Sequence, residues 1–281
     1  MRAEQVTDVL TYHGEGPCWS PSWGGLRWVD MLAGDVLTLR EDGGADRRHV
    51  GDVAAVVRPR RDGGAVIGVE RGFVLEDVQG FLSALPDLWS GHEVRMNEGG
   101  CDPQGRFYCG SMAYDQAPGA GSLYRLDPDG SVRVLLEGLT ISNGLEWTPD
   151  GARAYYNDTA THTISVFDHD PETGLTDRRP FVELGDDLNP DGLTVDADGG
   201  VWTALFGSGQ VRRYAPDGSL DTVVDVPARQ VTACTFGGPD LDELFVTTSR
   251  EGLGPDEDPL AGALFRARVG VRGMPVREFA G

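Results

Sequence analysis

The chain has 281 residues, of which 24 are basic and 45 are acidic, so its formal net charge is −21. This excess of acidic residues argues against nucleic acid or an anionic membrane as a partner. It favours a cation as a ligand. Hydrophobic residues make up 40% of the chain, enough for a sizeable core, and 40 glycines with 17 prolines favour short strands joined by tight turns. No apolar run approaches the ~18 residues that a membrane-spanning helix needs.

The N-terminus and the cysteines indicate the cellular compartment. Residues 1–5 have no apolar segment behind them, so we expect no secretory signal. The four cysteines, Cys18, Cys101, Cys109 and Cys234, lack CxxC spacing and lack a neighbouring histidine that would activate a nucleophile. They are interpreted as small buried thiols that stay reduced. These features together predict a cytoplasmic protein.

Short apolar runs follow one another along the whole chain, separated by turns rich in Gly, Asp and Pro. This pattern predicts strands joined by hairpins. In chain order, the expected strands cover residues 26–30, 35–40, 53–57, 64–69, 72–75, 105–110, 121–126, 152–158, 163–168, 200–204, 210–214, 243–248 and 262–267. No stretch of ten or more residues shows the apolar period of a capped helix.

One segment, residues 142–151, gives the register of a repeat. Its Thr148-Pro149 dipeptide opens a Pro-Asp-Gly turn, and similar marks recur at 20–21, 58–59 and 102–103 and, more weakly, at 196–197 and 237–238. The residues five positions before these marks are Glu15, Val53, Asn97, Asn143, Asp191 and Thr232, which lie 38 to 48 residues apart. Repeats of about 40 to 50 residues with several short strands are typical of β-propellers. We therefore predict an all-β fold, a six-bladed β-propeller with about four antiparallel strands per blade, as a single domain over residues 1–281.

The six register residues are expected to form a ring at one mouth of the central channel, because the innermost strand of each blade runs along that channel. Carboxylates that converge without a counter-ion repel one another and are costly to bury, and a divalent cation resolves that conflict. Glu15 and Asp191, with the amide of Asn143, form an all-oxygen set that suits Ca²⁺, Mg²⁺ or Mn²⁺, whereas Zn²⁺ prefers His or Cys. Three protein ligands would leave positions open for chemistry.

Some of these polar residues also admit a purely structural interpretation. Asn-Gly and Asp-Gly are common turn dipeptides, so the segments 143–144 and 191–192 could be turns and no more. The histidines are expected at the surface; they are His13, His49, His92, His162 and His169.

Several motifs occur in a characteristic order over almost the whole chain. They are GEGPCW at 14–19, RMNEGGCDP at 95–103, ISNGL at 141–145, YYNDT at 155–159, VFDHD at 166–170, PDGL at 190–193 and FGG at 236–238. In this order they resemble the SMP-30/gluconolactonase/regucalcin family. The resemblance implies a six-bladed propeller with one divalent cation in its channel. Members of the family include sugar lactonases, and some relatives hydrolyse organophosphates.

The resemblance also implies roles for individual residues. The metal ligands of the family fall on Glu15, Asn143 and Asp191, and the implied ion is Ca²⁺ first, with Mg²⁺, Mn²⁺, Zn²⁺ or Fe²⁺ as alternatives. Asn97 matches an asparagine that faces substrate and can lie close to the ion. Arg95, two residues earlier and so on the same face of the strand, matches an arginine that contacts substrate.

Two segments depart from the family pattern. Family members with a longer loop after Gly-Thr-Met carry an acidic substrate contact there, whereas here Met112 leads into the short loop 113–121. Asp115 is the nearest acid, and it cannot be equated with that contact. Residues 206–209, Phe-Gly-Ser-Gly, replace a bulky residue followed by Asn-Gly-Gly. We therefore expect the pocket wall and the choice of substrate to differ.

The resulting hypothesis is a lactonase: the metal-dependent hydrolysis of a sugar (aldono-)lactone to the sugar acid. The cation would polarise the lactone carbonyl, Asp191 would act as base or orient a water, and Arg95 and Asn97 would position the substrate. The expected partner is this small molecule, bound by a monomer or small homo-oligomer.

Three other functions remain open at this stage. One is a non-enzymatic Ca²⁺-binding regulatory protein, which needs only the ion. Another is a metal-dependent esterase or phosphotriesterase that uses the same ring under a more apolar pocket. The last is a protein-interaction propeller, which would have no reason to line its channel with carboxylates.

Overall fold

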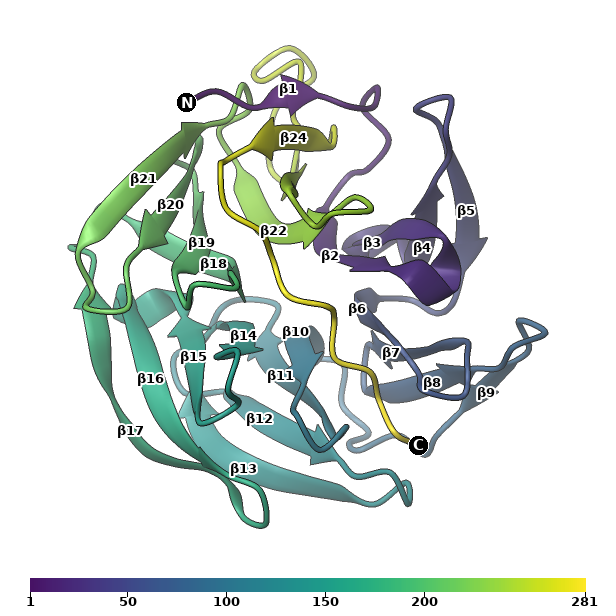
Figure 1. The fold of residues 1–281 in the computed structure, drawn as a ribbon. Coiled ribbons are helices and arrows are strands. Elements are labelled where there is room, and N and C mark those ends of the chain that lie inside the picture. Colours follow the sequence, from purple (N-terminus) through teal and green to yellow (C-terminus); the bar gives the residue numbers. More distant parts are fainter.

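A computed structural model describes all 281 residues and arranges the strands as six four-stranded antiparallel sheets. The sheets stand around a central axis like the blades of a wheel (Figure 1), so the predicted six-bladed β-propeller is confirmed. Helix is confined to three short 3₁₀ turns: η1 (Pro21–Trp23), η2 (Met31–Ala33) and η3 (Thr159–Thr161). No helix has the length and apolar character needed to cross a membrane.

The first three blades follow the chain, each from its innermost to its outermost strand. Blade 1 contains β2 (Gly14–Ser20), β3 (Gly25–Asp30), β4 (Asp35–Leu39) and β5 (Ala45–His49). Blade 2 contains β6 (Ala54–Pro59), β7 (Ala65–Val69), β8 (Gly72–Glu76) and β9 (Leu82–Ala84). Blade 3 contains β10 (Val94–Cys101), β11 (Phe107–Ala113), β12 (Gly121–Leu126) and β13 (Val132–Leu139).

The remaining blades keep the same order, except that the last one uses both ends of the chain. Blade 4 contains β14 (Ser142–Trp147), β15 (Arg153–Asp158), β16 (Thr163–Asp170) and β17 (Gly174–Glu183). Blade 5 contains β18 (Asn189–Val195), β19 (Val201–Phe206), β20 (Gln210–Tyr214) and β21 (Leu220–Asp225). Blade 6 contains β22 (Val231–Gly237), β23 (Glu243–Thr248), β24 (Phe265–Arg268) and, outermost, β1 (Glu4–Gln5).

The pairing of β1 with β24 closes the wheel. Glu4 pairs with Arg266 and Gln5 with Phe265 in an antiparallel register. The N-terminal residues therefore complete the last blade and give its outer strand a partner. The sequence pattern did not predict β1, because a strand of two residues is too short to show a period.

A β-bulge recurs at or next to the register residue of every innermost strand. In β14, Ser142 pairs with Asp158 and Leu145 with Tyr156, so three steps on the inner strand oppose two on its neighbour. The other five inner strands show the same kind of register shift. Bulges bend a strand and re-aim its side chains, and they are common next to active sites. Four of the six register residues, Glu15, Asn97, Asn143 and Asp191, lie at the channel mouth where the inner strands begin.

The glycines after Asn143 and Asp191 are required by close packing within strands, and the interpretation of these dipeptides as turns was wrong. A Cβ on Gly144 would lie 2.3 Å from the backbone nitrogen of Leu193 in the next blade. A Cβ on Gly192 would lie 2.4 Å from the Cβ of Ala233. Neighbouring inner strands thus approach one another more closely than any side chain would allow.

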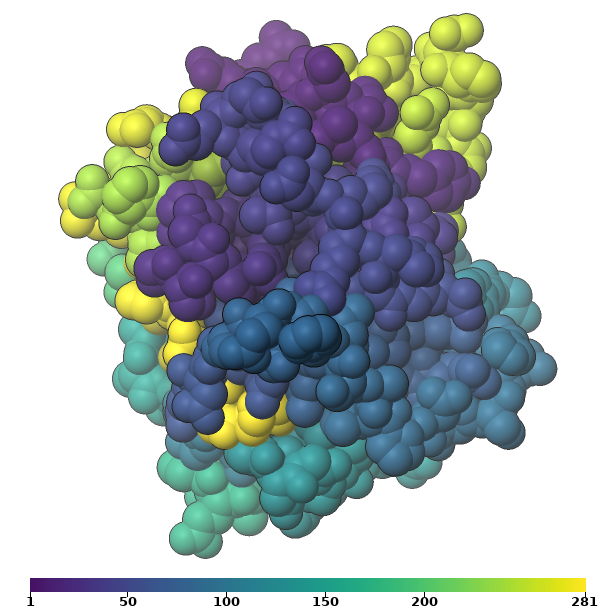
Figure 2. Space-filling view, turned by 90° about the vertical axis from the view of Figure 1, so that its right-hand side faces the viewer, coloured from purple at the N-terminus to yellow at the C-terminus, as the bar shows by residue number.

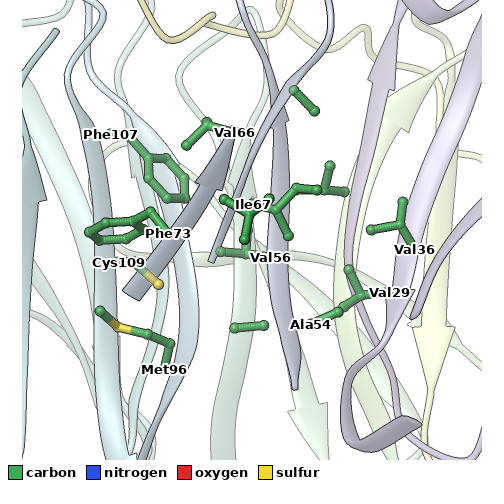
Figure 3. Packing of buried hydrophobic residues seen from close by; sticks show 14 of the residues in the cluster. Val29, Val36, Ala54, Val56, Val66, Ile67, Phe73, Met96, Phe107 and Cys109 are labelled. Atoms are coloured by element: carbon green, nitrogen blue, oxygen red, sulfur yellow. The ribbon is translucent and has the colours of Figure 1, made fainter. Parts of the chain in front are cut away.

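The core consists of apolar side chains packed between adjacent blades. Figure 3 shows one such layer, in which Val56 and Ile67 of blade 2 lie beside Phe107 and Cys109 of blade 3. The ring centroids of Phe73 and Phe107 are 5.7 Å apart at an interplanar angle of 77°, an edge-to-face arrangement. All four cysteines are free and buried, as predicted, and burial raises the pKa of the Cys18 thiol to about 12.

A C-terminal strap, residues 269–281, crosses one face of the wheel (Figure 1) and lies along the left-hand edge of the side view in Figure 2. It is held by backbone bridges from Gly273 to Asp196 and from Phe279 to Arg60. Arg277 donates to the Glu146 carboxylate at 3.0 Å. Because Glu146 lies near the end of β14, the strap covers the channel mouth where the inner strands finish, which is the mouth opposite the ring.

Candidate active site and cation site

A cavity of about 300 Å³ opens at the channel mouth where the inner strands begin. Its lining residues are His13, Glu15, Arg95, Asn97, Met112, Gln116, Ile141, Asn143, Thr159, Asn189, Asp191, Phe206 and Glu251. All five residues that the sequence singled out are among them. Segments from blades 1, 3, 4 and 5 that lie far apart in the chain are therefore brought to one cavity.

Glu15 and Asp191 are buried carboxylates with no arginine partner. Their exposed fractions are 3% and 6%, and neither forms an ion pair with an arginine. Burial raises the pKa of Glu15 well above its ordinary value, and the nearby charge of Asp191 raises it further. Burial likewise raises the pKa of Asp191, helped by the charge of Glu98. Both shifts reflect the free-energy cost of removing two carboxylates from water and placing them close to other negative charges.

Asn143 offers its amide oxygen on the cavity side. Its Nδ2 donates to Thr159 Oγ1 at 2.8 Å, and that hydroxyl donates in turn to the Pro190 carbonyl at 2.7 Å. Asn97 Nδ2 donates to Asn143 Oδ1 at 3.2 Å. The amide is therefore oriented by its neighbours, and a hydrogen bond from it to Asp191 partly offsets the burial that raises the pKa of that carboxyl.

This donor set fits a hard divalent cation. Two carboxylates without an arginine partner and an oriented amide oxygen are the ligands that Ca²⁺ prefers, and the ion would offset the burial and the repulsion that raise both pKa values. No group of three or more His, Cys, Asp or Glu side chains has metal-binding geometry. Protein ligation here therefore depends on the amide of Asn143, and a softer ion would find no imidazole or thiolate among the three.

Arg95 supplies a fixed positive charge in the cavity wall. It is only 5% exposed, and burial lowers its pKa. One guanidinium nitrogen, Nη1, donates to Asn97 Oδ1 at 2.5 Å and to the Met96 carbonyl at 3.1 Å. The guanidinium also lies over the ring of Tyr114, 5.8 Å from its centroid. Strand β10 thus presents Arg95 and Asn97 together, as the two-residue spacing predicted.

His13 and Glu251 line the cavity too, and sequence reasoning missed both. His13 was expected at the surface, but it is buried between blades 1 and 6. Its Nδ1 lies 2.8 Å from Ser249 Oγ and 3.2 Å from Glu251 Oε2, and its Nε2 lies 3.9 Å from Glu15 Oε1. The hydrogen bond from His13 lowers the pKa of the Glu251 carboxyl. The position of His13 directly before the GEGPCW motif was the one available signal.

The expectation that the histidines lie at the surface is correct for some of the others and wrong for one. His49 and His92 are exposed, as predicted. His169 is instead packed edge-on against Trp147, with ring centroids 5.9 Å apart, and its Nδ1 lies 2.8 Å from the Gly151 carbonyl. That position within blade 4 is structural and does not reach the cavity.

The short loop 113–121 contributes an amide to the cavity and no carboxylate. The exposed Asp115 accepts a hydrogen bond from the backbone nitrogen of Ala117 at 3.0 Å and does not line the cavity. Its neighbour Gln116, in the left-handed region at φ 57°, does line it. Phe206 provides part of the opposite wall. The wall therefore combines polar groups with three apolar side chains, those of Met112, Ile141 and Phe206.

Comparison with known proteins connects this geometry to a family. Residues 13–250 match the family described as SMP-30/Gluconolactonase/LRE-like region. The chain belongs to this family. The match begins at His13 and ends at Arg250, so it includes the whole ring and stops next to Glu251. The resemblance drawn from the sequence motifs is confirmed.

Three members illustrate how closely the chain follows its relatives. Pentonolactonase XacC of Haloferax volcanii is 37% identical, over 98% of this chain and 97% of its own. The 6-deoxy-6-sulfogluconolactonase of Pseudomonas putida is 34% identical, over 95% of each. The crystal structure of regucalcin, a calcium-binding protein from Agrobacterium tumefaciens, superposes with a TM-score of 0.93 at 28% identity, covering 99% of this chain and 97% of the other.

Proposed function

We propose that this protein is a sugar lactonase, which hydrolyses an aldono-lactone to the open sugar acid with the help of one divalent cation. The observation that carries the proposal is the meeting of two buried, unpaired carboxylates, Glu15 and Asp191, at a cavity that also holds Arg95 and Asn97. Relatives of nearly equal length named pentonolactonase and 6-deoxy-6-sulfogluconolactonase support it.

Glu15, Asn143 and Asp191 would hold the cation. Their oxygen ligands favour Ca²⁺, as does the likeness to a regucalcin described as calcium-binding, with Mg²⁺ and Mn²⁺ next and Zn²⁺ or Fe²⁺ as less suited alternatives. When bound, the cation supplies Lewis acidity toward the lactone carbonyl.

The side chains of the cavity would carry out the remaining steps. Asp191 would use one carboxylate oxygen to orient the attacking water or to take its proton. Arg95 has two further donors, Nε and Nη2, for which the structure records no protein acceptor, so they are available for substrate oxygens. Asn97 would fix the guanidinium and face the substrate beside it.

Lactone turnover before and after removal of metal tests this proposal. Gluconolactone, xylonolactone, arabinolactone and paraoxon would be supplied to enzyme treated with EDTA and then reloaded with Ca²⁺, Mn²⁺, Zn²⁺ or Fe²⁺. We expect sugar-lactone hydrolysis to disappear on chelation and to return with an oxygen-preferring ion. Hydrolysis that persists after chelation and in Asp191→Ala would contradict the mechanism, and preferential hydrolysis of paraoxon would favour the esterase alternative.

A non-enzymatic calcium-binding role is the second candidate, and the likeness to a protein described as calcium-binding favours it. Such a role needs Glu15, Asn143 and Asp191 but has no use for Arg95. Replacing Arg95 with methionine would then leave every measurable property unchanged. The lactonase proposal instead requires that this variant bind the cation normally and lose turnover.

A further inference from the structure

The cavity contains one carboxylate that the proposed chemistry does not use. Glu251 follows β23 in blade 6, and its side chain is 44% exposed, whereas that of Glu15 is 3% exposed. Glu251 therefore lies at the rim of the cavity, above the candidate cation ligands, where an entering substrate would meet it.

Glu251 is held in place from three directions. Its backbone nitrogen donates to Ser249 Oγ at 3.0 Å, and its carbonyl accepts from Gln230 Nε2 at 3.1 Å. Its carboxylate lies 3.2 Å from Nδ1 of the buried His13, which also contacts Ser249. A surface carboxylate without a role is normally free to move, whereas this one is fixed against the cavity wall.

The charges that remain in the cavity differ in how far they are exposed. Glu15 and Asp191 would be neutralised by the cation that they hold, which leaves Arg95 and Glu251 as the remaining charged groups of the cavity, with His13 between the carboxylates. Arg95 is 5% exposed and lies deep, while Arg250, the neighbour of Glu251, lines a separate surface hollow. The charge of Arg95 adds to the hydrogen bond from His13 in lowering the pKa of the Glu251 carboxyl, but Arg95 is buried whereas Glu251 is 44% exposed, so an entering ligand meets the carboxylate first.

A fixed carboxylate at such a place discriminates between ligands by charge. It accepts a hydrogen bond from a hydroxyl, whereas it repels a sulfonate or phosphate, which brings only acceptor oxygens and negative charge. The chain as a whole carries a net charge of −21, which adds to the repulsion of anions at longer range.

We propose that Glu251 is a specificity residue, positioned by His13, which selects neutral polyol lactones and rejects lactones that carry an anionic substituent. The inference rests on the proposed lactonase function and adds a substrate class to it. One relative is named for a sulfonated lactone, so the family scaffold does not by itself set this preference. In this chain, Glu251 sets it.

The test compares a matched pair of substrates, glucono-1,5-lactone and 6-deoxy-6-sulfoglucono-1,5-lactone, on calcium-loaded enzyme. Wild type should favour the neutral lactone by about tenfold or more in kcat/KM. Glu251→Gln should raise kcat/KM for the sulfonate and lower it for the neutral lactone, each by about three- to tenfold. Glu257→Gln, which removes a charge from the same loop where Glu257 pairs with Arg229 outside the cavity, should change neither.

Glu251→Gln is expected to change kcat/KM in opposite directions for the two substrates. This distinguishes a specificity role of Glu251 from a merely structural one. A merely structural role of Glu251 would move both substrates in the same direction, and that result, or an unchanged ratio, would overturn the inference while leaving the lactonase proposal intact. A wild type that prefers the sulfonate would also overturn it, since Arg95 would then dominate. A wild type that hydrolyses no lactone would contradict the proposed function itself.

A binding measurement makes the inference testable without turnover. Calorimetry with glucitol and with glucitol 6-sulfate reports the same charge discrimination. We expect Glu251→Gln to weaken the binding of glucitol and to strengthen that of the sulfate ester. The preference of wild type for glucitol should also shrink as salt rises from low to about 0.5 M, because a partly exposed charge is screened. The inference would be contradicted if glucitol and glucitol 6-sulfate bound with equal affinity to wild type and to Glu251→Gln.

Discussion

Buried carboxylates lie at both ends of the central channel, but only those at one end are paired with an arginine. At the end closed by the C-terminal strap, Glu98 is buried with its Oε1 3.2 Å from Arg58 Nη2, and the cavity beside that arginine holds about 40 Å³. At the open end, Glu15 and Asp191 are just as buried, have no arginine partner and face a cavity of about 300 Å³.

This difference shows which carboxylates belong to the framework and which belong to a site. Asn97 and Glu98 are neighbours in the bulge of β10, yet Asn97 lines the open cavity while Glu98 pairs with Arg58. A paired carboxylate makes its stabilising contacts within the fold, whereas an unpaired one stores a cost that only a ligand relieves. Each prediction below changes one end of the channel and compares the outcome with the other.

The largest effect is expected at the open end. Asp191→Asn keeps the size of the side chain but removes one of the two charges that would hold the cation and the oxygen proposed to activate water. We expect lactone kcat/KM to fall on the order of 10²–10³-fold, measured by proton release with calcium present. Asp186→Asn, an equal charge change on the exposed turn before β18, is the control. A similar fall in both variants would contradict the assignment.

Glu98→Gln tests the closed end. It leaves the Arg58 guanidinium buried without its counter-charge, so we expect a loss of about 3 kcal/mol in the free energy of unfolding, measured by urea denaturation. One calcium ion should still bind, with a modest fall in affinity, because the negative charge of Glu98 reaches both Glu15 and Asp191. The double variant Glu98→Gln with Arg58→Met should recover part of the loss, because it removes both charges. A variant as stable as wild type would show that the pair does not hold this end together.

Calcium should stabilise the protein, and more strongly as pH rises. Burial raises the folded-state pKa of Glu15 and of Asp191, so in the calcium-free protein their contribution favours folding below their unfolded pKa values. That contribution is lost as pH rises through the folded pKa values. Calcium at 100 times its Kd adds about 2.7 kcal/mol. Unfolding at pH 5 and pH 7.5, with and without calcium, should show the larger gain at pH 7.5, and equal gains would contradict the account.

The smallest effect is expected in the strap. Arg277→Ala removes the contacts of the guanidinium with Glu146 and with the Thr148 carbonyl, which lies 2.7 Å away. We expect a loss of about 1 kcal/mol in unfolding free energy and unchanged lactone turnover, because these contacts are partly exposed and lie at the far mouth. A large loss of turnover would show that the two ends of the channel are coupled.

The sequence predicted those parts of the fold that repeat. The turn marks, of which Thr148-Pro149 is the clearest, recur near the end of the inner strands, and stepping back five residues from them found Glu15, Asn97, Asn143 and Asp191, which the structure brings to one cavity. Strand β1 and the C-terminal strap carry no such mark, because each occurs once. Their contacts depend on how the first and last blades meet in the folded protein. No local sequence pattern predicts such contacts.

The rim of the site was missed for a related reason. His13 precedes the first inner strand, and Glu251 lies in the long connection between β23 and β24, where the repeat is interrupted. A lone histidine and one of many acidic residues give no signal in a chain this acidic. Their contact depends on the closure of blade 6 beside blade 1, which only the three-dimensional structure displays.

Calorimetric titration of calcium into chelator-treated protein tests most directly whether the open end of the channel is a cation site. The account predicts one ion bound per chain in wild type and in Glu98→Gln, and none in Asp191→Asn at the same concentrations. Absence of binding in wild type, or the same stoichiometry and affinity in Asp191→Asn, would contradict it.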